Sequence, residues 1–158
     1  MQAFTDNKER TWEVAITIGS VKRIKALTGV DLFALDEGDP PLFTRLGVDA
    51  VLLCDVVCAI IRPQLQQADI SDEAFAEGLA GDAATRMCAA FWKDLATFFR
   101  SLNRLDLVQA IEKQAEMILK AVAKVKANVE KIDAEKIVDE IVDEIFENSL
   151  ADGQGSSA

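Results

Sequence analysis

The sequence contains no histidine and no tyrosine. Without histidine, Ser-His-Asp triads and imidazole-based acid–base catalysis are excluded. Glycine-rich phosphate-binding motifs of the GxGxxG and Walker types are also missing. Paired carboxylates are present, but they fall in a predicted loop, a first helical turn and a solvated helical face, where acidic residues serve capping or solubility. They occupy positions 36–37, 72–73, 139–140 and 143–144. The sequence therefore predicts a protein that is not an enzyme and that binds no cofactor.

Cysteine is scarce, with only Cys54, Cys58 and Cys88. An odd number of cysteines in a chain without a recognisable secretion signal indicates reduced thiols. Cys54 and Cys58 are spaced i, i+4 on a predicted helix, a spacing that two metal ligands could use. That helix is apolar, however, and no histidine exists to complete a zinc site. Because buried cysteine behaves as a small hydrophobic residue, the sequence favours core positions over a metal site.

Long hydrophobic runs and an excess of basic residues are absent too. The longest apolar run, residues 50–61, is interrupted by Asp55 and is shorter than the roughly 20 residues that span a bilayer. The N-terminal residues lack the pattern of a secretory signal, so we expect a cytoplasmic protein without membrane contact. The net charge of −10, from 27 acidic and 17 basic residues, argues against nucleic acid as a partner.

Residues 4–17 have the pattern of two short strands around a polar turn. Phe4 precedes the turn sequence TDNKER, and from Trp12 to Ile18 every second residue is large and apolar. This period of two is typical of a half-buried strand. A two-stranded hairpin is marginal on its own, so we expect its apolar face to pack on the helices that follow.

Helix start and stop signals divide the rest of the first hundred residues into several helices. These signals are N-caps at Ser20, Asp49 and Ser71, a C-terminal stop at Gly29, and breaks at Pro40, Pro41 and Pro63. Residues 62–70 are predicted to be a connection, and residues 83–100 a main core helix with an aromatic stripe. The predicted core comprises Trp12, Val14, Ile16, Ile24, Leu27, Leu52, Leu53, Val56, Phe75, Leu79, Phe91, Leu95 and Phe98.

Asp55 is the one acidic residue inside the apolar run. Arg62 lies seven residues later on the same helical face, which favours a structural role for Asp55 at a partly exposed edge. A functional carboxylate with a shifted pKa is the alternative.

From residue 105 onward the pattern changes to a narrow apolar seam with alternating steps of three and four, as in a coiled coil. We predict that this seam binds a partner protein. Its predicted partner-binding residues are Val108, Ile111, Ile118, Val122, Val125, Val129 and Ile132. Beyond it, residues 137–148 repeat an apolar pair and an acidic pair with a period of four. Residues 133–158 carry eight acidic side chains and one basic one, so most of the net charge lies here.

Several phrases resemble a family of small phage and prophage proteins, the tail assembly chaperones. They are FTDNKERTW, VKRIKALTGVDL, CAIIRPQ and DEAFAEGLAGD, in the same order over residues 2 to about 104. The resemblance implies a cytoplasmic protein, absent from the virion, that keeps the tape measure protein soluble and helps to recruit tail tube subunits. The chain after about residue 105 carries no phrase of that family.

The predicted fold is mainly α-helical with a small N-terminal β-hairpin. Residues 1–104 are predicted to form a compact domain, residues 105–148 an extension of long amphipathic helices, and residues 149–158 a disordered tail. Two functions remain open: an assembly chaperone that binds the tape measure protein and tail tube subunits, and a structural or adaptor protein that self-associates through its C-terminal helices.

Overall fold

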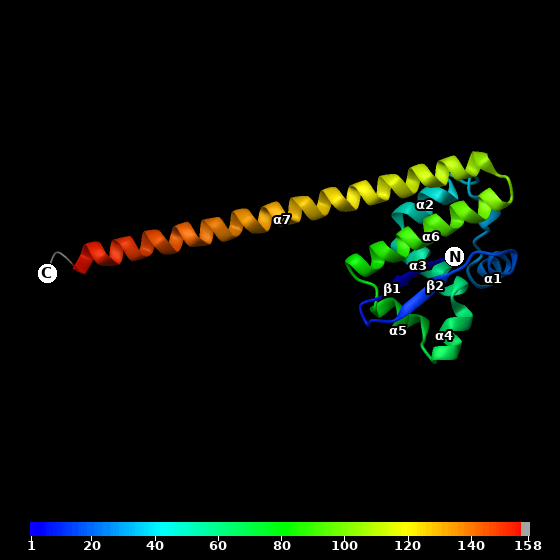
Figure 1. Cartoon of the computed structure of the whole chain (residues 1–158), viewed down its shortest axis with the longest axis horizontal. Helices are drawn as coiled ribbons and strands as arrows, with labels where there is room; N and C mark the ends of the chain where they lie inside the picture. Colours follow the sequence, from blue (N-terminus) through cyan, green and yellow to red (C-terminus); the bar gives the residue numbers. More distant parts are fainter. Residues whose placement is uncertain (156–158) are drawn as a thin grey trace. The chain divides into compact units, whose positions relative to one another are not determined.

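The computed structural model describes the backbone of residues 1–155 and the side chains of residues 1–121, 123–124, 127–128, 130–131 and 135–147. Over these residues a two-stranded antiparallel hairpin precedes a series of helices (Figure 1). The elements are β1 (Gln2–Thr5), β2 (Thr11–Val14), α1 (Ile18–Thr28), the 3-10 helix η1 (Leu32–Ala34), α2 (Leu42–Val48), α3 (Ala50–Ile60), α4 (Arg62–Ala68), α5 (Asp72–Glu77), α6 (Asp82–Ser101) and α7 (Leu105–Gly155). The predicted fold class is confirmed.

The chain divides into two compact units, Met1–Leu119 and Lys120–Ala158. The first unit extends past residue 104, where the sequence predicted the domain to end, and it includes the first turns of α7. The second unit consists of later turns of α7. Because neither proline nor glycine occurs in residues 105–152, the predicted C-terminal helices form one continuous helix. The helix includes residues 149–155 of the predicted tail, and residues 156–158 lie outside the described part of the chain.

The hairpin buries one face against the helices, as predicted. Phe4 pairs with Trp12 across the strands, and both side chains are buried. Each of these rings meets the ring of Phe75 edge to face, with centroid distances of 6.3 and 5.4 Å respectively. β1 also lies against α6 (Figure 1). Just beyond β2, the backbone N–H of Ile16 donates to the buried carboxylate of Asp94 at 2.7 Å, which fixes the end of the hairpin to α6.

The start of α1 differs from the prediction. Thr17 is the N-cap, and Ser20 completes a capping box from the third helical position. The predicted strand pattern therefore stops before Ile18, which opens the helix and is 52% exposed. Gly29 ends α1 with φ of 75°, as its predicted role requires.

The other caps agree with the sequence, with one additional helix. Asp49 and Ser71 accept hydrogen bonds from the backbone N–H groups of Leu52 and Ala74, respectively. Residues 62–68, predicted as part of a connection, form α4. Pro63 lies in the first turn of that helix, where the missing N–H costs no intrahelical bond. Proline thus ends α3 and begins α4.

The core agrees with the predicted residues except for three. Leu27 is 53% exposed, because α1 turns Val21, Ile24 and Thr28 toward the interior and Leu27 lies outside that face. Leu52 and Leu79 are only partly buried. The remaining ten are buried, and the apolar helix α3 contributes a nearly continuous buried run up to Ile61. Among the described residues, no helix combines the length and apolar character needed to span a membrane.

Candidate partner-binding site

The first part of the predicted seam lies inside the first unit. Val108 and Ile111 are buried at 4% and 1% exposure, and Ile118 is partly buried against the same core. These side chains thus pack within the chain and present little or no exposed surface. Val122, Val125, Val129 and Ile132 lie outside the residues whose side chains are described. The partner-binding role of the seam stays a prediction.

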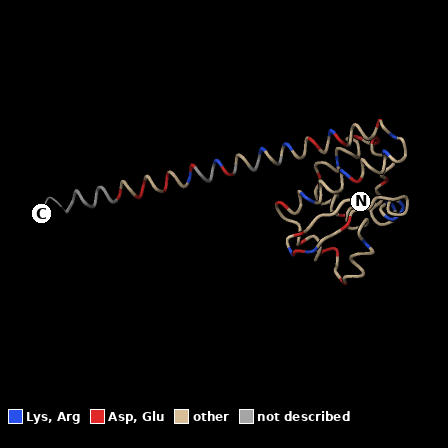
Figure 2. Tube along the Cα trace, viewed as in Figure 1, with Lys and Arg blue, Asp and Glu red and all other residues tan. Residues whose placement is uncertain are grey.

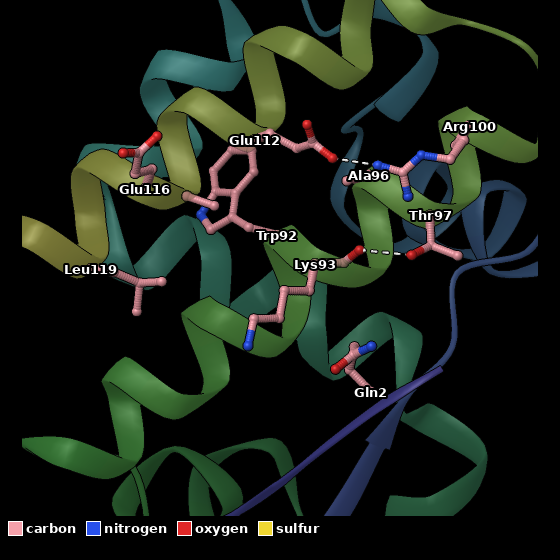
Figure 3. A pocket seen from close by; sticks show the side chains of 10 residues that line it. Gln2, Trp92, Lys93, Ala96, Thr97, Arg100, Glu112, Glu116 and Leu119 are labelled. Carbon is pink, nitrogen blue, oxygen red and sulfur yellow. Dashed lines mark hydrogen bonds and ion pairs between the residues drawn. The ribbon is translucent and has the colours of Figure 1, made fainter.

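Contacts to α2 and α6 hold the first turns of α7 in place. A Cβ atom added at Gly47 of α2 would overlap the side-chain amide of Gln114, so the end of the Gln114 side chain lies directly against Gly47. On the other side, Arg100 of α6 forms an ion pair with Glu112 of α7 (Figure 3). Both partners of that pair are about half exposed, so its role is orientation more than stability.

A shallow cavity of about 430 Å³ lies between α6 and the first turns of α7 (Figure 3). Its apolar wall includes Trp92, Ala96, Ala115 and Leu119. The indole N–H of Trp92 is buried and has no hydrogen-bond partner within the described part of the chain. The cavity contains no histidine or cysteine, and the hydroxyl of its Thr97 donates to the carbonyl of Lys93. It can accept an apolar group, and its lining offers no nucleophile paired with a base.

Six apolar side chains on the later turns of α7 are exposed, and we call them the distal stripe. They are Ile137, Val138, Ile141, Val142, Ile145 and Phe146, with exposed fractions between 50% and 65%. The sequence signal for this stripe is the period-four repeat of residues 137–148, whose acidic face predicts solubility, whereas the predicted binding residues lie on the preceding seam. In the second unit this stripe is the main apolar surface among the described side chains.

Acidic residues occupy the rest of the helix surface along the distal stripe. At roughly 100° per residue, the six apolar side chains span about half of the helix circumference. The other half holds Asp139, Glu140, Asp143, Glu144 and Glu147, and residues 137–147 include no lysine or arginine. Figure 2 shows these acidic residues along the later turns of α7. The segment is thus a helix with one apolar half and one acidic half.

Two charged side chains outside α7, Arg62 and Asp6, have well-defined structural partners. Arg62 pairs through both of its terminal nitrogens with Asp72 of α5, and Asp55, for which a partly exposed position was predicted, is exposed. In the hairpin turn, Asp6 is buried and accepts hydrogen bonds from Trp12, Arg10 and the backbone of Lys8. Burial raises the pKa of Asp6, but these hydrogen bonds outweigh it and hold the pKa below its ordinary value.

The cysteines are free thiols. Cys54 and Cys58 share a hydrogen bond, which together with burial raises the pKa of Cys58. Burial likewise raises the pKa of Cys88. Within the described residues, no group of three or more histidine, cysteine or acidic side chains is placed to hold a metal ion.

No family model, curated protein or solved structure matches this chain.

Proposed function

We propose that this protein is a phage tail assembly chaperone that binds the tape measure protein and helps to recruit tail tube subunits. The observation that carries the proposal is the distal stripe, an apolar half-face exposed on a long helix. A protein that keeps another chain soluble needs an apolar surface for its partner and a charged surface for water, and residues 137–147 combine both.

The resemblance of residues 2 to about 104 to tail assembly chaperones supplies the identity of the partner. Tape measure proteins of long-tailed phages are long helical chains, and amphipathic helices are the natural complement of an exposed apolar helix face. The first unit then acts as the folded body from which α7 begins. A non-catalytic role also fits the absence of histidine from the sequence.

Co-expression tests the proposal. The chain would be produced together with the product of a long, helix-rich reading frame next to its own gene. We expect that product to move from the insoluble to the soluble fraction and to co-purify with the chain. A product that stays insoluble in the presence of the chain, or that is equally soluble without it, would contradict the proposed function.

The oligomeric state of the purified chain distinguishes the chaperone from the alternative, a self-associating structural or adaptor protein. A chaperone would run as a monomer without its partner. An adaptor would form homo-oligomers at micromolar concentration, which sedimentation equilibrium measures directly.

A further inference from the structure

The distal stripe covers about half of the helix circumference, which is more apolar surface than a fully solvated helix usually exposes. Its borders are acidic, which disfavours pairing with the same stripe of a second copy. On a helical wheel Ile137 and Phe146 lie at the two edges of the apolar half, with Val138 and Ile145 nearest its centre. Asp139 follows directly beyond the Phe146 edge, and Glu144 lies next to the Ile137 edge. Both borders of the apolar face are therefore acidic.

We infer that the distal stripe docks an amphipathic helix of another protein whose apolar face is bordered on both sides by lysine and arginine. This inference rests on the proposed function and gives the chemistry of the partner. Electrostatic complementarity selects the occupant, because a basic border would form ion pairs with Asp139 on one side and Glu144 on the other. Burial of the apolar side chains provides most of the affinity, and the charged borders provide the specificity for the partner.

Two other occupants are disfavoured by charge. If the distal stripe of a second copy met this stripe, acidic borders would lie against acidic borders in either orientation, since both edges of the stripe carry the same sign. The first unit carries a net charge of the same sign as the stripe's borders, because residues 1–119 hold 18 acidic and 12 basic side chains, a net charge of −6. A helix of another protein with basic borders is the occupant whose charges would attract the acidic borders of the stripe.

Two synthetic peptides provide the probe. Both would be amphipathic helices of about three heptads with leucine on the apolar face, one with lysine and one with glutamate at the border positions. Titration of fluorescently labelled peptide with the full chain measures each affinity. We expect the lysine peptide to bind at least about tenfold more tightly than the glutamate peptide at low salt, and the difference to shrink as salt increases.

Charge reversal at the two borders tests the assignment to this face. The double variant Asp139→Lys and Glu144→Lys should lose or invert the preference for the lysine peptide. The matched control, Glu13→Lys and Glu77→Lys, changes the net charge equally at exposed positions in the first unit and should keep the preference. Equal effects of the two variants would overturn the inference, because net charge alone would then explain binding.

A second variant tests the apolar half of the helix. Ile141→Ser with Ile145→Ser should weaken binding of both peptides at least about tenfold, because two apolar contacts of the stripe are lost. The helical content and unfolding midpoint of the first unit should not change. Unchanged peptide binding would overturn the inference, as would a dimer of the unmodified chain that this variant dissociates.

The probes separate this inference from the proposed function. The peptides contain no phage sequence, so failure of tape measure co-expression leaves their result standing. Capture of the tape measure protein by the Ile141→Ser, Ile145→Ser variant would overturn the distal stripe as the docking surface and leave the chaperone function in place.

Discussion

Asp6 shows how one side chain can organise a turn. Its carboxylate accepts hydrogen bonds from the backbone N–H groups of Lys8 and Arg10, from the Arg10 guanidinium at 2.8 Å and from the Trp12 indole at 2.9 Å. The side chain is fully buried between these donors. A buried carboxylate is stable only when it is this completely satisfied.

Replacement of this carboxylate should be costly at neutral pH. For Asp6→Asn we expect the free energy of unfolding to fall by about 2 to 4 kcal/mol, because the amide leaves donors unpaired around the Arg10 guanidinium. Because the folded-state pKa of Asp6 is lowered, its contribution is present above the unfolded pKa and is lost as the pH falls through the folded pKa. The difference between the proteins should therefore shrink below about pH 3.8.

Urea unfolding followed by circular dichroism at pH 7 and pH 3 measures both effects. The matched control is Asp55→Asn, an exposed position of the same residue type, which should change stability by less than about 0.5 kcal/mol. An equal loss in both variants, or a loss for Asp6→Asn that does not depend on pH, would show that the charge of Asp6 is not the cause.

For single residues, the sequence predicts which apolar side chains are buried better than it predicts which groups hydrogen-bond to a polar side chain. Burial of Trp12, Phe75 and Phe91 follows from periodicity, because a repeated apolar position identifies the inward face of an element. The role of Asp6 does not follow, since an acidic residue in a polar turn has the same local pattern whether it is solvated or buried. Only the arrangement of Phe75 and α5 against the turn determines which of the two occurs.

Among the elements, β2 depends on a helix that the sequence did not predict. The side-chain amide of Gln64 on α4 accepts from the backbone N–H of Glu13 at 2.9 Å and donates to its carbonyl at 2.8 Å. This pair of bonds resembles the pairing of a neighbouring strand and satisfies part of the open edge of β2. As a stop signal Pro63 predicts no helix after Ile61, but proline is equally compatible with the first turn of a new helix, which is its place in α4.

Loss of this amide should loosen the hairpin selectively. We expect Gln64→Ala to lower the free energy of unfolding by about 1 to 2 kcal/mol, since two hydrogen bonds to one backbone unit are removed. Amide hydrogen exchange at Glu13 should become faster, because its N–H loses the bond to Gln64. The control Gln67→Ala, at an exposed position on the same helix, should leave both measurements unchanged. Equal exchange at Glu13 in both variants would contradict this role.

For the whole molecule, the decisive difference from the sequence is the position of the domain boundary. The change to a seam pattern near residue 105 indicates a new element correctly, but a change of periodicity does not tell whether that element packs on the preceding domain. Leu107, Val108 and Ile111 are buried, so the first turns of α7 complete the core. The first unit accordingly ends at Leu119.

Truncation distinguishes the two boundaries. A chain of residues 1–119 should unfold at the same urea concentration as the full chain, because the buried side chains are retained. A chain of residues 1–104 should lose several kcal/mol, since each large apolar residue removed from the core contributes about 1.5 to 3 kcal/mol. Circular dichroism measures both transitions. Equal midpoints for the two truncated chains would restore the boundary at residue 104.

The two tryptophans give this molecule separate optical reporters. No tyrosine is present to transfer excitation energy to them, so ultraviolet emission comes almost entirely from Trp12 and Trp92. Both indoles are buried, but only the N–H of Trp12 is hydrogen-bonded to a carboxylate, whereas that of Trp92 has no partner among the described residues and its side chain lines the cavity beside the first turns of α7. A change in the colour of Trp12 emission therefore signals opening of the hairpin, and a change at Trp92 signals that α7 has lifted from α6.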